Sequence, residues 1–224
     1  MCGKYRPVST DMELLVKIRR RGRRMPTKTL QEVAWPATDA LGRICQLNKK
    51  SLYAVATSAK SNQETSIKAI DRLRELWLSM DEAACERAAH MPVLLLNFNL
   101  DRSEWWHWVL HQGPRPVRAI EFDPPLTLHD PVPLLREILV EACVIVRSHP
   151  RAARLVFAMS ESVVATFGNL SASEIDSIAL NHHVELQLRW ADNLTYWKHL
   201  LTAAVEGPFE ELSAVRVHTL QLLG

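Results

Sequence analysis

The sequence predicts a mainly α-helical protein, a multi-helix bundle with a helix-turn-helix-like segment in its C-terminal half. Two observations predict this class. Apolar residues recur at helical spacing through most of the chain, and Ser or Asp repeatedly stands where such a helix would begin. The composition agrees, since 47% of the 224 residues are hydrophobic and 23% are charged, as is usual for a globular protein. The longest apolar run, 91–100, is too short to cross a bilayer, so we expect no membrane association.

Residues 1–60 are predicted to form a basic N-terminal region with short helices. Asp11 can cap a first helix that Pro26 ends, and further short helices are expected on either side of Pro36. The region holds 13 Lys and Arg against 4 Asp and Glu, a net charge of +9. Residues 61–224 hold 14 against 21, a net charge of −7. A basic N-terminal part on an acidic body indicates contact with nucleic acid or with an acidic partner.

Residues 61–113 are predicted to form a helical segment. Ser79 followed by Glu82 has the pattern of a capping box, which predicts the start of a second helix there. The apolar run that comes next fits a buried strand or a buried helical turn, and its length does not distinguish the two. The expected elements are a helix at 62–79, a capped helix at 79–90, the apolar run at 91–100 and a short aromatic helix at 101–113.

Six prolines and the lack of a helical period mark residues 114–133 as a Pro-rich, extended connector. Residues 134–224 are predicted to form a C-terminal helical domain. Its first helix is so apolar that we expect it to be central, and several shorter helices follow it. No internal repeat is evident in the sequence.

The helix-turn-helix-like segment is 157–178. Ser160 can cap a first short helix, and Ser171 with Glu174 forms a capping box for a second helix after a Gly-Asn break. In a DNA-binding helix-turn-helix the second helix enters the major groove and offers Arg, Lys, Gln or Asn to base edges. Here Glu174 and Asp176 stand at the start of that helix and would face phosphates unfavourably. The composition therefore favours packing over base reading.

Residues 155–190, LVFAMSESVVATFGNLSASEIDSIALNHHVELQLRW, resemble the flagellar master-regulator family, FlhD with its partner FlhC. The resemblance lies in the apolar pattern, in the polar helix starts at Ser160 and Ser171, and in the closing Arg189-Trp190. It covers about a sixth of the chain and implies a mainly helical, DNA-associated transcription activator that works as a hetero-oligomer. FlhC-type subunits hold a four-cysteine zinc site. The cysteines of this chain depart from that pattern, so no zinc ligand is carried over.

The stretch 17–24, KIRRRGRR, holds the residues that we predict to contact nucleic acid. Charges this dense repel one another, and they become favourable when they replace the counterions of phosphates. An acidic partner surface and a solvated arm without a role are the alternatives. The predicted nucleic-acid-binding residues are Lys17, Arg19, Arg20, Arg21, Arg23 and Arg24.

Three tryptophans, Trp105, Trp106 and Trp108, fit a core wedge or an interface, and we predict a partner interface there. Beside them, Glu104, His107 and His111 share one side of the same helix. Metal sites in helical bundles need a second such helix, which the sequence lacks. The adjacent histidines at 182 and 183 would point to different sides of a helix and are not expected to bind one ion.

The four cysteines, at 2, 45, 85 and 143, never form a C-x-x-C pair, and no secretory signal is evident. We expect reduced thiols in a cytoplasmic protein. A four-cysteine zinc site assembled across the fold is the less favoured alternative. No Gly-rich phosphate loop, G-x-S-x-G or H-E-x-x-H motif occurs. We therefore predict no enzyme, no cofactor and no metal.

Together these features predict a cytoplasmic transcriptional regulator that acts through DNA and a partner protein, as part of a hetero- or homo-oligomer. The alternative is a helical adaptor or structural protein, for example of a secretion apparatus, that binds only protein. A third class, a helical metalloenzyme that uses Glu104, His107 and His111, is disfavoured for the reason given above.

Overall fold

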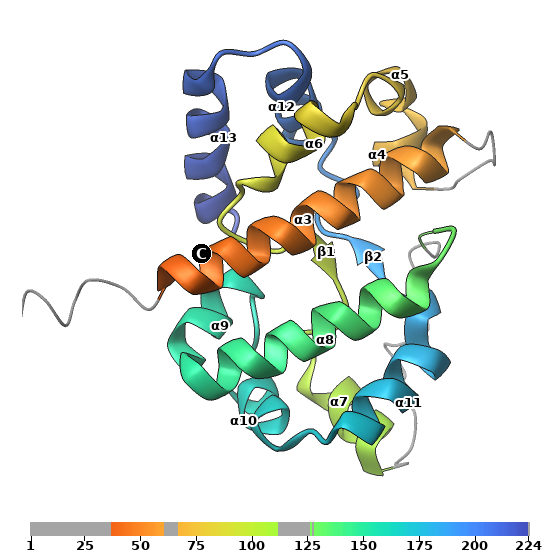
Figure 1. Cartoon of the computed structure of the whole chain (residues 1–224), viewed down its shortest axis with the longest axis vertical. Coiled ribbons are helices and arrows are strands. Elements are labelled where there is room, and N and C mark those ends of the chain that lie inside the picture. Colours follow the sequence, from red (N-terminus) through yellow and green to blue (C-terminus); the bar gives the residue numbers. More distant parts are fainter. Residues whose placement is uncertain (1–36, 61–66, 112–125, 127, 224) are drawn as a thin grey trace, which may run out of the picture. The chain divides into compact units, whose positions relative to one another are not determined.

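The computed structural model describes residues 37–60, 67–111, 126 and 128–223. The chain divides into two units, Met1–Trp35 and Pro36–Gly224, and all described residues belong to the second. The described part is mainly helical, as the sequence predicts, and two short strands lie among its helices (Figure 1).

The elements follow one another along the chain in two groups, before and after residues 112–125. The first group is α3 (Ala37–Lys60), α4 (Lys68–Asp71), α5 (Arg74–Leu78), α6 (Glu82–Ala89), β1 (Leu96–Asn97) and α7 (Ser103–His111). The second group is α8 (Pro131–Ser148), α9 (Pro150–Val156), α10 (Glu161–Asn169), α11 (Ala172–His182), the 3₁₀ turn His183–Glu185, β2 (Gln187–Leu188), α12 (Leu194–Val205) and α13 (Phe209–Gln221).

One long helix, α3, stands where the sequence pattern suggested short helices beyond Pro36. Its buried residues, Ile44, Leu47 and Val55 among them, recur at helical spacing and face α5, α6, α8 and α9. α3 therefore belongs to the core of the second unit. For this reason the chain divides before α3, between residues 35 and 36, and not near residue 60.

The structure corrects the single helix predicted at 62–79. Its described part consists of α4 and α5, because Leu73 (φ −110°, ψ 21°) leaves the helical conformation between them. Ser79 ends α5 and donates its hydroxyl to the carbonyl of Glu75 at 3.0 Å. The cap of α6 is Asp81, whose carboxylate accepts the N–H of Ala84 at 2.7 Å. The apolar run after α6 contains the two-residue strand β1.

The two caps predicted in the C-terminal half are confirmed. The Ser160 hydroxyl accepts the N–H of Val163 at the start of α10. Ser171 and Glu174 form a reciprocal capping box at the start of α11: the hydroxyl accepts the Glu174 N–H at 3.3 Å, and the carboxylate accepts the Ser171 N–H at 2.8 Å. Upstream, α8 begins at Pro131, inside the predicted connector, and buries a continuous apolar face as a central helix.

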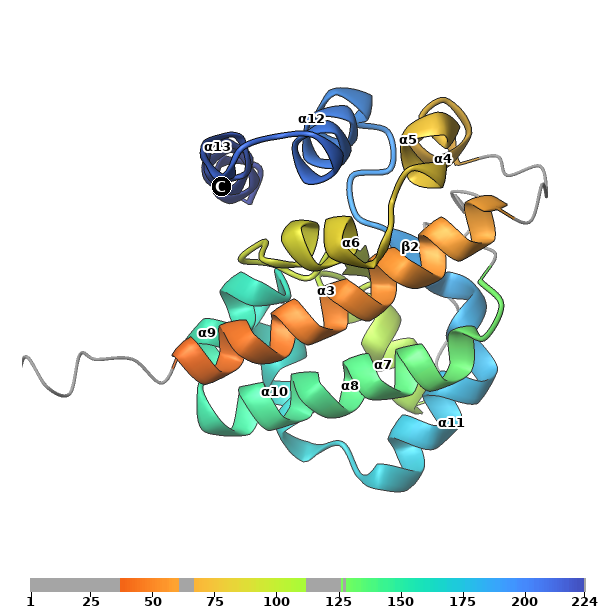
Figure 2. The same ribbon diagram turned by 45° about the horizontal axis from the view of Figure 1, so that its top comes forward.

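Most of the described chain forms two similar halves, residues 37–111 and residues 131–205, and α13 follows the second half. Each half begins with a long helix, α3 or α8, continues through shorter helices to a two-residue strand, and ends in a further helix, α7 or α12. α3 and α8 lie side by side and run in opposite directions (Figures 1 and 2). The strands pair antiparallel, with Leu96 opposite Leu188 and Asn97 opposite Gln187. The two halves are therefore arranged like the two copies of an internal two-fold repeat.

Local details after the two strands match as well. Asn99 and Trp190 follow β1 and β2 in the left-handed conformation, with φ of 49° and 53°. The next helix of each half then carries a buried tryptophan whose indole N–H donates to a carbonyl beside the strand at 2.9 Å, Trp106 to Asn99 and Trp197 to Arg189. The repeat is not evident in the sequence, and the elements between long helix and strand differ in length: α4, α5 and α6 in the first half, and α9, α10, α11 and a 3₁₀ turn in the second.

The two halves exchange their last helices. α7 of the first half packs on α10 of the second, where the Trp106 and Phe167 rings meet edge to face at 4.6 Å. α12 of the second half packs on α5 and α6 of the first, where Trp77 and Trp197 lie 5.6 Å apart. The halves therefore share one core, and neither half can bury its apolar surface alone.

The stretch Met91–Asn97 crosses the centre of this core with little regular structure of its own. Its backbone is satisfied by side chains from both halves. Asn48 on α3 donates to the carbonyl of Val93 at 2.8 Å and accepts the N–H of Leu95 at 2.8 Å, with longer contacts to the carbonyls of residues 89 and 91. Buried backbone groups need such partners, because an unpaired one costs about 1–3 kcal/mol.

Arg189, beside β2, supplies the other donors. Its guanidinium donates to the carbonyls of Leu94 at 2.8 Å and Phe157 at 2.9 Å, while its backbone N–H donates to Leu95 at 2.8 Å. Burial lowers the pKa of Arg189 to about 10, which still leaves it charged at neutral pH. A buried cation is tolerated here because carbonyl oxygens surround it.

No helix among the described residues is long and apolar enough to span a membrane.

We expect Asn48→Ala to lower the free energy of unfolding by about 3 kcal/mol, because it leaves at least two buried backbone groups unpaired. Urea unfolding followed by circular dichroism measures the change. Asn181→Ala on the exposed face of α11 is the matched control and should shift stability by no more than about 0.5 kcal/mol. Equal effects of the two substitutions would contradict the role given to Asn48.

Arg189→Met keeps most of the side-chain length and removes the donors to Leu94 and Phe157. The same unfolding measurement should show a loss of about 3 kcal/mol or more, since the carbonyls stay buried without their partner. Arg102→Met replaces an exposed arginine and provides the comparison. A stability equal to that of the parent protein would show that the carbonyls find other donors.

Candidate functional site

The residues predicted to bind nucleic acid lie outside the described residues. Lys17, Arg19, Arg20, Arg21, Arg23 and Arg24 all belong to the first unit, Met1–Trp35. Their prediction rests on the sequence alone.

Two of the three tryptophans of the predicted interface belong to the protein core. Trp105 and Trp106 are only 2% and 1% exposed, and both rings pack edge to face against Phe98 at 5.1 and 5.9 Å. Neither residue has surface to offer to another chain, which corrects the predicted interface for these two. Trp108 is partly exposed and packs its ring edge to face with His182 at 5.6 Å. The spacing alone could not separate these cases, since tryptophan suits a core and an interface equally well.

The second helix of the helix-turn-helix-like segment, α11, faces α8 through Ile175, Ile178 and Ala179. Its outer face carries no Lys or Arg. Asp176 forms an ion pair with Arg136 of α8, and Glu174 is occupied by the capping box, which lowers the pKa of its carboxyl group through hydrogen bonds from Ser171. The apolar face of α11 and the side chain of Asp176 therefore contact α8, and Glu174 stabilises the start of α11 itself.

The histidines considered from the sequence do not form a metal site in the described residues. His107 and His111 are exposed, with ring centroids 4.7 Å apart, but Glu104 does not bring a third ligand atom to them. The adjacent histidines serve separate contacts: Nδ1 of His182 lies 3.2 Å from the buried Glu185 carboxylate, whereas Nδ1 of His183 lies 2.9 Å from the carbonyl of Leu180.

A different cluster emerges where α3, α6 and α13 meet. Cys45 on α3 with Glu86 and His90 at the end of α6 bring a thiol, a carboxylate and an imidazole nitrogen within 4.8 Å of one another. They line a largely apolar pocket of about 620 Å³, to which α13 contributes Arg216 and Leu220. These residues were not singled out from the sequence. The single clue there is the i, i+4 spacing of Glu86 and His90, because Cys45 is brought to them only by the packing of α3 on α6.

Three charged neighbours of Cys45, namely Glu86, Arg216 and Lys49, set the electrostatics of this pocket. Burial and the nearby Glu86 carboxylate raise the pKa of the Cys45 thiol, so Cys45 is not an activated nucleophile. Lys49, one turn further along α3, contacts Glu86 at 2.6 Å and Glu82 at 3.3 Å. These contacts raise the pKa of Lys49 and lower that of Glu86.

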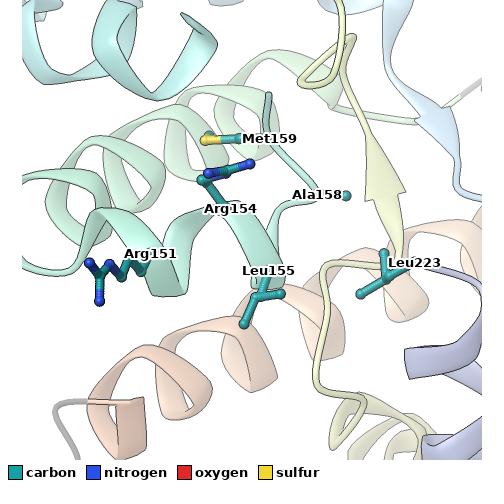
Figure 3. Close-up of a pocket in the computed structure, with 6 residues that line it drawn as sticks. All are labelled: Arg151, Arg154, Leu155, Ala158, Met159 and Leu223. Carbon is teal, nitrogen blue, oxygen red and sulfur yellow. The ribbon is translucent and has the colours of Figure 1, made fainter. Parts of the chain in front are cut away.

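A second pocket, of about 510 Å³, lies between α9 and the C-terminal end of the described chain (Figure 3). Leu155, which is 65% exposed, and Leu223 project toward it, while Arg154 lies beside Met159 and Arg151 extends away from the others. The turn after α9 is made by Ala158, with a φ of 53° that side chains other than glycine adopt at some cost. The result is an exposed apolar patch with two arginines beside it.

Comparison with known proteins finds no family model that matches the chain, no similar characterised protein and no similar solved structure. The resemblance of residues 155–190 to the FlhD and FlhC family therefore stays a prediction.

We expect Glu86→Gln to speed the alkylation of Cys45 by iodoacetamide near neutral pH. Removing the carboxylate charge takes away one cause of the raised thiol pKa, and Lys49, no longer paired with Glu86, favours the thiolate further. Peptide mass spectrometry in metal-free buffer gives the rate at each cysteine.

Glu82→Gln is the matched control, because it also loses a contact with Lys49 but does not affect the Cys45 thiol. Cys143, whose pKa burial raises to about 11, is the internal reference and should react slowly in both variants. Unchanged reactivity of Cys45 in Glu86→Gln would show that the carboxylate does not control the thiol.

Proposed function

We propose that the chain is a transcriptional regulator that binds DNA through its basic N-terminal unit and a partner protein through its helical unit. One observation carries the proposal: the division of charge coincides with the division of the chain. Residues 1–35 hold nine Lys and Arg against three Asp and Glu, a net charge of +6. Residues 36–224 hold eighteen against twenty-two, a net charge of −4, and the two values give the overall +2.

The charge pattern supports a backbone contact more than base reading. Dense arginines bind phosphates through the release of counterions, a term that does not depend on sequence. The helix-turn-helix-like segment offers nothing to add to it, since α11 carries no Lys or Arg and its acidic residues are held by Arg136 and Ser171. Under this proposal, selectivity for a DNA site comes from the partner protein.

The patch beside α9 is the surface that we assign to the partner. Leu155 and Leu223 present apolar surface, and Arg151 and Arg154 are exposed next to them. By charge complementarity this combination suits an amphipathic helix with acidic residues along one edge. Arg154 contacts Glu161 only at 3.7 Å, so a partner carboxylate can compete for it.

The alternative is a helical adaptor or structural protein that binds protein and no nucleic acid. The acidic outer face of α11 and the net charge of −4 on residues 36–224 favour it. The tryptophan cluster no longer argues for it, because Trp105 and Trp106 are buried.

The two functions are separated by binding of the full chain to duplex DNA, measured by fluorescence anisotropy over a series of salt concentrations. We expect affinity to fall steeply with salt. Changing five arginines to Ala should weaken binding and reduce the slope of log K against log[salt] by up to about 4.5 units, if each contacts a phosphate. The five are Arg19, Arg20, Arg21, Arg23 and Arg24.

A matched control removes five exposed basic residues from the helical unit, so that both variants change charge equally. These are Lys60, Lys68, Arg72, Arg102 and Lys198, none of which lies on the surface assigned to the partner. The control should keep the affinity of the parent protein for DNA. Equal affinity of the arm variant and the parent, or binding that does not depend on salt, would rule out the role of the arm. Copurification of a protein with no nucleic-acid absorbance would support the adaptor instead.

A further inference from the structure

We propose that Cys45, Glu86 and His90 bind a zinc ion that links α3 to α6. The proposal goes beyond the regulatory function above and does not depend on it. It rests on three residues of different ligand chemistry that the fold brings to one wall of a pocket.

The geometry is the first argument. The three potential ligand atoms lie within 4.8 Å of one another, whereas ligands at 2.0–2.3 Å from a tetrahedral zinc are separated by about 3.5 Å. Rotation of the Cys45 and Glu86 side chains covers the difference, because both residues are only partly buried. Glu86 and His90 lie one turn apart on α6, so they approach an ion from the same side.

The tautomer of His90 is the second argument. Its Nδ1 lies 2.8 Å from the backbone carbonyl of Glu86, where a neutral imidazole donates its N–H. The lone pair then resides on Nε2, the ring nitrogen that is left for coordination. Zinc-binding histidines commonly have this arrangement, with the second ring nitrogen bonded to a carbonyl that fixes the orientation of the ring.

The ligand set selects the metal. A thiolate and an imidazole favour zinc and disfavour magnesium and calcium, which prefer oxygen ligands. Three protein ligands leave a fourth position, and the pocket of about 620 Å³ gives water access to it. Charge also balances, since the thiolate and the carboxylate together neutralise Zn²⁺.

Zinc binding releases one proton from Cys45 and displaces Lys49 from its ion pair with Glu86. The Cys45 Sγ–H bond breaks, the sulfur keeps the electron pair and binds zinc, and the proton passes to solvent. Lys49, now 2.6 Å from Glu86, retains its second partner Glu82 at 3.3 Å. Arg216 and Lys49 both lie close enough to act electrostatically on the Cys45 thiol, and their positive charges oppose zinc binding.

The test uses the full chain, purified with a chelator that is then removed. Competition with a chromophoric chelator should show one tight Zn²⁺ per chain, and Co²⁺ should give a thiolate-to-cobalt charge-transfer band in the near ultraviolet. Cys45→Ser should abolish that band, and it and His90→Gln should each weaken Zn²⁺ binding about 100-fold or more, since even loss of an outer-shell partner costs 10- to 100-fold.

The control is the double variant His107→Gln with His111→Gln, which removes the exposed histidine pair of α7. It should bind Zn²⁺ as the parent protein does. Thermal unfolding without metal, followed by circular dichroism, establishes that each variant folds, and added Zn²⁺ should raise the midpoint only where Cys45 and His90 are present. The proposal is overturned if the parent binds no Zn²⁺, if Cys45→Ser keeps the charge-transfer band, or if the histidine-pair variant alone loses binding.

Discussion

The buried backbone of Met91–Asn97 is the constraint on which the rest of the described structure depends. A stretch without helix hydrogen bonds cannot cross a core unless other groups satisfy its N–H and C=O groups. Asn48 does so from α3 and Arg189 from the end of β2, and the carbonyl of Val156 accepts the N–H of Leu94 at 2.7 Å. These bonds join three segments that are far apart in the sequence, so the positions of α3, α9 and β2 are tied to the same stretch.

The exchange of helices between the two halves follows from this crossing. Because β1 and β2 pass each other antiparallel at the centre, the helix after each strand emerges on the side of the other half, where Trp106 meets Phe167 and Trp197 meets Trp77. The segment that resembles a helix-turn-helix is part of this interlocked core. Its second helix packs its apolar face on α8, and its outer face carries no Lys or Arg that could contact phosphates.

Function in this chain is therefore expected away from its most recognisable motif. The basic residues that we predict to bind DNA lie in the first unit. The exposed Leu155 and the partly exposed Leu223 lie beside α9, and the zinc ligands that we propose lie where α3 meets α6. The last of these would add a metal link between two helices that already pack closely, close to the end of α6 from which the central stretch begins. A metal there would act on the stability of the core as a whole.

The sequence by itself determined what local interactions decide. The caps at Ser160 and Ser171 bond to groups three residues away, and helical spacing of apolar residues marks which face is buried, so both could be read correctly. Only the tertiary structure decided the rest: that the predicted helix at 62–79 breaks at Leu73, that Trp105 is core and not interface, and that Cys45 meets His90. Those outcomes depend on contacts between distant segments, and no short stretch of sequence contains both partners of such a contact.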